Sequence, residues 1–136
     1  IKKYPKQLIP NNIHFLGKVS EKAKNTLINN CEMLVLPSVN RSEAFGMVLL
    51  EASRACKPLI TTEIKSGTSD INIHDVTGIV IESKNVAQLT TAIKFLFDNP
   101  EIAKQMGLNA RNKFIDSYTS EKMCSELFNE YKKLIY

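Results

Sequence analysis

The chain has 136 residues, with 18 Lys and Arg against 14 Asp and Glu and a formal net charge of +4. This length corresponds to one domain with a core of its own, and contents of 43% apolar and 24% charged residues are typical of a globular protein. Disordered, collagen-like and low-complexity classes are therefore excluded. The longest apolar runs have four residues, whereas a membrane-spanning helix needs about twenty.

Neither the cysteines nor the histidines suggest a metal site. Cys31, Cys56 and Cys124 are widely spaced and form no C-x-x-C pair, and His14 and His74 are equally far apart. Because each cysteine has apolar neighbours, we expect buried, reduced thiols in a cytoplasmic protein.

The positive charge is spread rather than clustered. Lys residues are distributed over expected helix faces, and aromatic residues do not interleave with them, so a solvated surface is favoured over a nucleic-acid partner. A mildly basic face could still bring the protein to anionic lipid head groups, which allows peripheral association with the inner face of the plasma membrane.

Short strand-like runs alternate with longer helical runs along the chain, which predicts an α/β fold with a parallel sheet covered by helices. Strands are expected at residues 13–16, 32–36, 58–61 and 78–81. Gly17 ends the first strand and Pro37 stops the second.

Helices are expected between these strands. Ser20 is the predicted N-cap of a helix through Asn30, and Glu21 lies in its first turn. Residues 46–56 form a helix that is apolar almost all round and is therefore central. A polar, turn-rich segment follows at residues 65–75.

The chain after Glu82 is predicted to be helical. Asn99 and Pro100 mark a helix start. That helix should stop near Gly107, with a further helical stretch to about residue 116 and a last helix from Ser120. The apolar stripes of these helices are interpreted as core packing; they comprise Val86, Leu89, Ile93, Leu96 and Phe97, and then Met123, Cys124, Leu127, Phe128, Tyr131, Leu134 and Ile135.

Residues 37–52, with the sequence PSVNRSEAFGMVLLEA, follow a buried strand and open a helix. Open α/β sheets bind ligands at this edge. Gly46 allows a close backbone approach, and the unpaired N–H groups of the helix start suit a phosphate. Glu51 is costly to bury in an apolar helix without a partner, which is either a pair of ribose hydroxyls or a basic side chain.

Glu43 and Glu51, separated by seven residues with Phe45-Gly46 between them, resemble the Glu-x7-Glu signature of retaining glycosyltransferases with the GT-B fold, particularly glycosyltransferase family 4. The similarity continues in KPLITT at residues 57–62, TGIVI at 77–81, Met106-Gly107 and the run NAR at 109–111. It covers nearly the whole chain from Asn12 onward. The resemblance implies that residues 1–136 are one Rossmann-like, nucleotide-sugar-binding C-terminal domain, truncated at its N-terminus and lacking the acceptor domain.

The resemblance also implies roles for single residues. Glu43 would contact the hydroxyls of the donor sugar near the reacting carbon, as the candidate catalytic residue. Glu51 would hold the ribose hydroxyls, and the backbone N–H groups of Phe45, Gly46 and Met47 would face the sugar and diphosphate.

The segment after the first strand, including Gly17 and Val19, would lie beside the nucleobase. The implied reaction transfers a hexosyl group, with a mannosyl group as one candidate, from a GDP- or UDP-linked sugar to a saccharide or lipid-linked acceptor hydroxyl. It retains the anomeric configuration, serves polysaccharide or glycolipid biosynthesis, and needs no metal or other cofactor, because electrostatics stabilise the departing diphosphate.

Three departures from the family pattern stand out. Cys56 replaces a usual glycine, and residues 66–70 replace a Gly-Gly-x-Pro-Glu run. The family's diphosphate-binding Arg and Lys pair lies upstream, and nothing before Asn12 matches it. These residues alone should therefore bind the donor at best and transfer nothing.

Two alternatives of other classes stay open. The first is a non-catalytic nucleotide-sugar-binding half that docks on a separate acceptor-binding subunit. The second is a doubly wound interaction domain that binds no nucleotide, which an exposed apolar surface and an internal pairing of Glu51 with a basic residue would favour.

Overall fold

A three-stranded parallel sheet forms the centre of the computed structural model, which describes residues 10–40 and 45–135. The strands β1 (Leu34–Leu36), β2 (Leu59–Glu63) and β3 (Gly78–Glu82) lie in the order β1-β2-β3. Leu34 pairs with Leu59, and Leu59 pairs with Gly78. The predicted parallel α/β class is confirmed, as are three of the four predicted strands.

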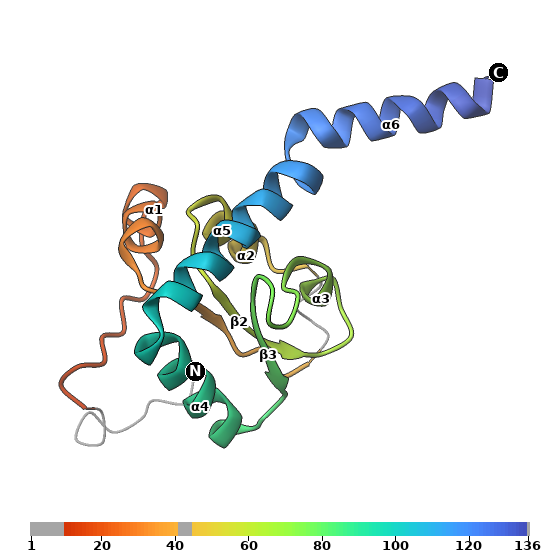
Figure 1. The fold of residues 1–136 in the computed structure, drawn as a ribbon. Coiled ribbons are helices and arrows are strands. Elements are labelled where there is room, and N and C mark those ends of the chain that lie inside the picture. Colours follow the sequence, from red (N-terminus) through yellow and green to blue (C-terminus); the bar gives the residue numbers. More distant parts are fainter. Residues whose placement is uncertain (1–9, 41–44, 136) are drawn as a thin grey trace.

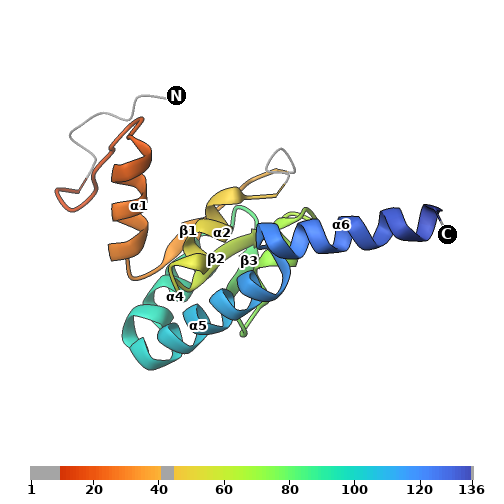
Figure 2. The ribbon, with the colours of Figure 1, turned by 90° about the horizontal axis from the view of Figure 1, so that it is seen from above.

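Helices flank the sheet (Figures 1 and 2). They are α1 (Glu21–Asn30), α2 (Met47–Arg54), α3 (Thr68–Ile71), α4 (Val86–Asp98), α5 (Pro100–Ser117) and α6 (Ser120–Ile135). The predicted cap of α1 is confirmed, because the Ser20 side chain accepts a hydrogen bond from the Ala23 amide at 3.2 Å. The turn-rich segment contains the short helix α3, which the sequence reading did not predict.

Alternate residues of the strands build two cores, one on each face of the sheet. Leu59 belongs to a cluster with Leu49 of α2 and Ile71 of α3. Its neighbour Ile60 belongs to a second cluster with Leu96 of α4 and Met106 of α5. Successive side chains of a strand point to opposite faces of the sheet. Because both faces are covered by a core, consecutive positions of a strand can both be apolar. The predicted central position of α2 is confirmed.

The strand predicted at residues 13–16 is wrong. This segment has no regular secondary structure, and Ile13, Phe15 and Leu16 are 50%, 75% and 56% exposed. A strand needs a neighbour for its backbone hydrogen bonds, and the sheet provides none within the part of the chain that the structure describes, since it contains only β1, β2 and β3.

The break predicted near Gly107 is also wrong, because α5 continues through it to Ser117. Gly107 instead lies where α5 crosses the turn between α2 and β2. A Cβ atom at this position would lie 2.0 Å from the carbonyl oxygen of Cys56. Here glycine permits close packing rather than ending a helix.

The interpretation of the C-terminal stripes as core is corrected for α6 and in part for α4. No residue of α6 is buried, and the helix projects away from the body (Figure 1). In α4, Leu96 is buried, but Val86 and Phe97 are 74% and 72% exposed. Helical periodicity identifies an apolar face without saying what covers it.

The expected burial of the cysteines is corrected as well. All three thiols are free, but Cys31 and Cys56 are half-buried and Cys124 is exposed on α6. Desolvation by partial burial raises the pKa of the Cys31 thiol, which keeps it protonated and unreactive near neutral pH.

Candidate functional site

The start of α2 has the backbone geometry expected of a ligand-binding helix terminus. Gly46 is its N-cap in the left-handed region, with φ 79° and ψ 60°, a conformation that favours glycine. A Cβ atom there would lie 3.0 Å from Leu49 Cδ1 and 3.2 Å from Leu36 Cδ2. The first N–H groups of an α-helix have no partner within the helix, so α2 offers donors and a positive dipole end at the loop that follows β1.

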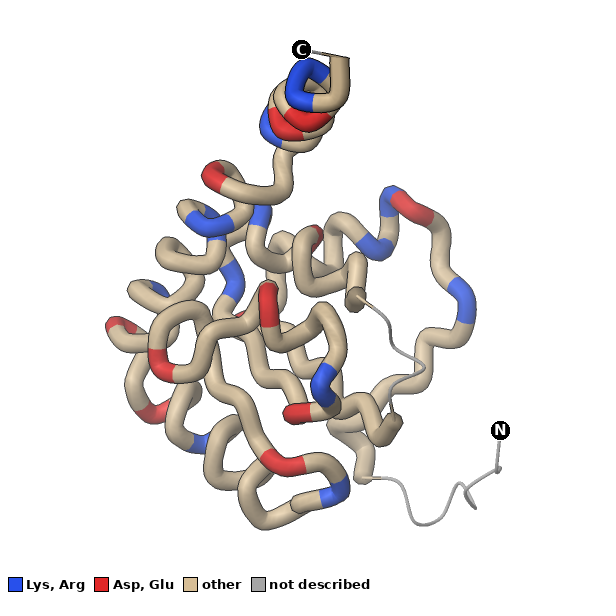
Figure 3. Tube along the Cα trace, turned by 90° about the vertical axis from the view of Figure 1, so that its right-hand side faces the viewer, with Lys and Arg blue, Asp and Glu red and all other residues tan. Residues whose placement is uncertain are grey.

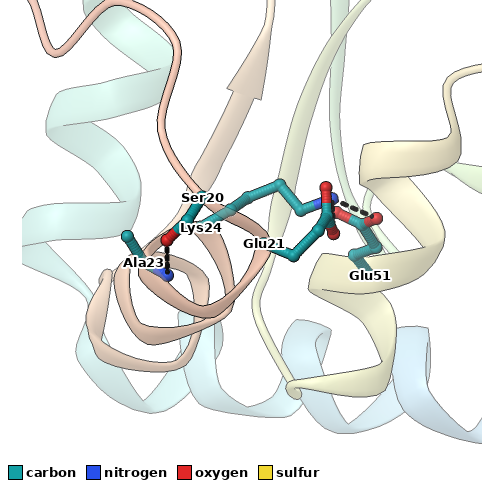
Figure 4. Close-up of polar contacts among 5 residues, drawn as sticks. All are labelled: Ser20, Glu21, Ala23, Lys24 and Glu51. Atoms are coloured by element: carbon teal, nitrogen blue, oxygen red, sulfur yellow. Dashed lines mark hydrogen bonds and ion pairs between the residues drawn. The ribbon is translucent and has the colours of Figure 1, made fainter.

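Glu51 lies in α2 with its two carboxylate oxygens in different surroundings. Oε1 accepts a hydrogen bond from Lys24 Nζ of α1 at 2.8 Å (Figure 4). Oε2 is buried and has no hydrogen-bond partner among the residues that the structure describes. Of the two partners that the sequence allowed, the basic side chain is therefore present, and one oxygen still lacks a donor.

Lys24 also pairs with a second carboxylate. Its Nζ lies 2.8 Å from Glu21 Oε2, one turn earlier on α1. The hydrogen bonds that Lys24 donates, first to Glu21 and then to Glu51, raise the pKa of Lys24 above its ordinary value. Lys24 therefore keeps its positive charge around neutral pH.

A hollow of about 280 Å³ opens beside this cluster. Helices α1, α2 and α5 all contribute to its wall, so its shape depends on the packing of α1 and α5 against α2. The lining residues are Glu21, Asn25, Met47, Leu50, Glu51, Arg54, Phe114 and Tyr118. Its mixture of carboxylates, an amide and aromatic rings suits a polar ligand with a flat apolar part.

Aromatic contacts fix one side of the hollow. The rings of Phe45 and Tyr118 meet edge to face, with centroids 6.0 Å apart. The Tyr118 hydroxyl donates to the Asp70 carbonyl at 3.0 Å. Burial, assisted by the charge of Asp70, raises the pKa of Tyr118. Phe45 is thereby held next to the N-terminus of α2.

The structure brings some of the predicted site residues together. Met47 and Glu51 line the hollow, and Phe45 contacts its wall through Tyr118. Gly17 and Val19 precede α1 and are not among the lining residues. Gly17 has φ 64° with open space around it, so its conformation alone explains the glycine. The candidate catalytic residue Glu43 lies outside the described residues.

The sequence reading missed Lys24 and Tyr118. Lys24 is 27 residues from Glu51, so no local spacing connects the two. The one available signal was the need of Glu51 for a basic or hydroxyl partner. Tyr118 lies just after α5, where nothing in the sequence relates it to α2.

Other features of the described residues do not extend the site. Larger hollows, of about 570 Å³ beside β3 and α4 and about 410 Å³ near the turn before β2, include none of the predicted site residues that the structure describes. Within residues 10–40 and 45–135, no group of three His, Cys, Asp or Glu side chains could hold a metal. Helices long and apolar enough to span a membrane are absent from the same ranges. Lys and Arg are interspersed with Asp and Glu along the trace (Figure 3).

Together, the parallel sheet, the glycine-capped helix after β1 and the carboxylate in that helix define an α/β domain of the Rossmann-like kind. The family of glycosyl transferases group 1 matches residues 2–113. The chain therefore belongs to this family, which confirms the resemblance in the sequence.

Two curated relatives and one solved structure illustrate the relationship. The chain is 42% identical over 109 residues to D-rhamnosyltransferase WbpZ of Pseudomonas aeruginosa, covering 80% of this chain and 29% of that protein. It is 38% identical over 124 residues to O-antigen chain mannosyltransferase C of Escherichia coli, covering 91% of this chain and 33% of that protein. The chain thus spans about a third of the length of these relatives.

The fold matches the structure of Anabaena Alr3699/HepE in complex with UDP and glucose, with a TM-score of 0.78 at 18% identity. The match covers 90% of this chain and 32% of that one. At this identity the likeness concerns the fold alone, and it confirms the GT-B assignment.

Proposed function

We propose that this chain supplies the donor site of a glycosyltransferase that moves a hexosyl group, with retention, from a nucleoside-diphosphate sugar to an acceptor hydroxyl. The single observation that carries the proposal is membership of the glycosyl transferases of group 1 over residues 2–113. The unpartnered Oε2 of Glu51 beside a polar hollow supports a ligand site at that position.

The names of the two relatives guide the choice of sugar and pathway. One is a D-rhamnosyltransferase and the other an O-antigen chain mannosyltransferase. D-Rhamnose is 6-deoxy-D-mannose, so both names refer to sugars of the manno configuration. We therefore favour a mannosyl-type donor, linked to GDP or UDP, and a saccharide or lipid-linked acceptor in polysaccharide or glycolipid assembly.

The residues take the following roles in this proposal. Glu51 accepts hydrogen bonds from the ribose hydroxyls, and the N–H groups of Phe45, Gly46 and Met47 face the sugar and diphosphate. The segment containing Gly17 and Val19, ahead of α1, is assigned to the nucleobase. Glu43, outside the described residues, is assigned to the donor sugar.

The bond between the anomeric carbon and the diphosphate oxygen breaks as the acceptor oxygen attacks from the same face. The acceptor proton passes to the departing diphosphate, so no covalent enzyme intermediate is needed. The positive end of the α2 dipole stabilises the charge that develops on the leaving group. A reaction without metal, a cytoplasmic location, approach to the inner face of the plasma membrane and the absence of a nucleic-acid partner stay predictions.

Nucleotide titration followed by heteronuclear NMR tests the donor site. In the complete polypeptide, one of UDP, GDP and ADP should shift the amide signals of Gly17, Gly46 and Glu51. Glu51→Ala should weaken that binding about tenfold or more, because it removes a charged hydrogen-bond acceptor. Glu126→Ala, on the projecting α6, is the matched control and should bind as the wild type does. The absence of any signal shift with all three nucleotides would contradict the proposal.

Two other candidates have specific observations in their favour. Glu51 is paired with Lys24, and α6 exposes Phe128, Tyr131 and Leu134, as expected of an interaction domain that binds no nucleotide. The exposed apolar face of α6 also fits a nucleotide-sugar-binding half that docks on a separate acceptor-binding subunit. The same titration separates them: the interaction domain predicts no shift with any nucleotide, whereas the docking half binds nucleotide but transfers sugar only with its partner subunit.

A further inference from the structure

The pairing of Lys24 with Glu51 is asymmetric. The ammonium group of Lys24 occupies only Oε1, and Oε2 is buried without a hydrogen-bond partner within residues 10–40 and 45–135. The side chains of Lys24 and Glu51 are 30% and 28% exposed, so both are partly shielded from water. A carboxylate oxygen that has no donor can accept a hydrogen bond from a ligand.

Lys24 is itself held in place. Its second carboxylate, Glu21 Oε2, lies 2.8 Å from Nζ on the same helix, and α1 packs against α2. The ammonium group therefore bridges two helices, with both contacts drawn in Figure 4. A clamped ammonium restricts the rotamers of Glu51 more than solvent would, because moving the carboxylate breaks a charged hydrogen bond.

We propose that Lys24 is a positioning residue for the donor nucleotide: it fixes the Glu51 carboxylate through Oε1 and leaves Oε2 without a protein donor among the described residues, so that a ribose hydroxyl can bond to Oε2 when the nucleotide enters the hollow that Glu51 lines. This inference rests on the proposed function, since it assumes that Glu51 accepts from ribose. Lys24 acts through Glu51 and does not touch the ligand. The orientation of the carboxylate is settled before binding, which lowers the entropy lost when the hydroxyl bonds.

The same ion pair has an opposite interpretation, in which Lys24 occupies the carboxylate and competes with the hydroxyls. A competing cation would satisfy the oxygen that the ligand needs. Here it leaves Oε2 unsatisfied at a buried position, which is costly, and a hydroxyl donor would remove that cost. The geometry therefore favours positioning over competition.

Isothermal titration calorimetry on the complete polypeptide distinguishes the two. The probes are UDP and GDP, each compared with its 2′,3′-dideoxy analogue, which lacks the ribose hydroxyls. The variants are Lys24→Met, which removes the charge at similar length, and Lys24→Arg, which keeps it. Lys22→Met removes an exposed lysine from the same helix and is the matched control. Thermal unfolding checks that each variant is folded, and Lys24→Gln replaces Lys24→Met if that protein is not.

We expect Lys24→Met to weaken binding of the ribonucleotide about tenfold, the size of one charged hydrogen bond, and to leave binding of the dideoxy analogue unchanged. Lys24→Arg should restore most of the affinity, and Lys22→Met should have no effect. Equal affinity of Lys24→Met and wild type, tighter binding by Lys24→Met, or equal losses for both ligands would each overturn the positioning role while leaving the proposed function in place. Failure of the wild type to bind either ribonucleotide would overturn the proposed function and this inference together.

Discussion

The carbonyl oxygen of Cys56 faces the Cα atom of Gly107 so closely that a Cβ atom on Gly107 would lie 2.0 Å from it. The turn before β2 and the middle of α5 thus meet backbone to backbone. Helix α2 ends just before Cys56 and packs along α5. The contact between Cys56 and Gly107 therefore fixes how the end of α2 lies against α5.

Gly107→Ala should therefore destabilise the fold by about 3 kcal/mol, since a close-packed backbone cannot move without shifting α5. The higher helix propensity of alanine, about 1 kcal/mol, offsets only part of this. Urea unfolding measures the change. Gly17→Ala is the control: it has a positive φ but open space, and should cost about 1 kcal/mol. Equal losses for the two variants would show that the close approach is absent.

Cys56 itself has φ 57°, in the left-handed region, which explains why the family pattern has glycine there. Cys56→Gly should stabilise the protein by up to about 1 kcal/mol through relief of this conformation. Cys56→Ala keeps the Cβ atom and should bring no gain. A stabilising Cys56→Ala would point to the thiol rather than the backbone as the source of strain.

The sequence predicts best what is decided locally. Ser20 caps α1 and Pro100 begins α5, because capping depends on groups a few residues apart. The strands β2 and β3 were predicted from short apolar runs. In contrast, the segment at residues 13–16 has a strand pattern but no neighbouring strand to complete it, and pairing is a property of the whole sheet.

The candidate site shows the same contrast between features decided locally and features that depend on residues far apart in the sequence. Gly46 and Glu51 could be singled out because both belong to one loop and helix. Lys24 and Tyr118 reach this site from α1 and from the end of α5, so only the packing of helices reveals them. Gly107 was misread for the same reason, since its close neighbour is 51 positions earlier in the sequence.

Asn72 should be the most sensitive polar residue of the core. It is 1% exposed, and its Nδ2 donates to Thr61 Oγ1 at 2.8 Å and to the Ile79 carbonyl at 3.2 Å, which joins β2 and β3. Asn72→Ala should cost about 2 to 4 kcal/mol, because it leaves buried groups without partners. Asn29→Ala, exposed on α1, should change stability by less than about 0.5 kcal/mol. Similar losses in urea unfolding would contradict the bridging role.

The apolar face of α6 should contribute little to the stability of the domain. Leu127 and Leu134 are 54% and 81% exposed, so replacing both with Gln should change the free energy of unfolding by less than about 0.5 kcal/mol. Leu96→Ala, at a residue 2% exposed, should cost about 2 to 5 kcal/mol. A large loss on changing α6 would mean that its face is covered in solution.

The raised pKa of Tyr118 predicts that the protein loses stability at alkaline pH. Burial, with a smaller effect of Asp70, raises its pKa above the ordinary value of 10.0, so the folded protein keeps this proton when the unfolded chain has lost it. The stabilisation is complete below pH 10.0 and is lost as the pH rises through the folded pKa.

Tyr118→Phe should lower stability by about 1 kcal/mol at neutral pH, through loss of the bond to the Asp70 carbonyl. Its stability should then decline less steeply than that of the wild type above pH 10.0. Tyr131→Phe on the exposed α6 should follow the wild-type curve, and a Tyr118→Phe curve parallel to the wild type would refute the raised pKa.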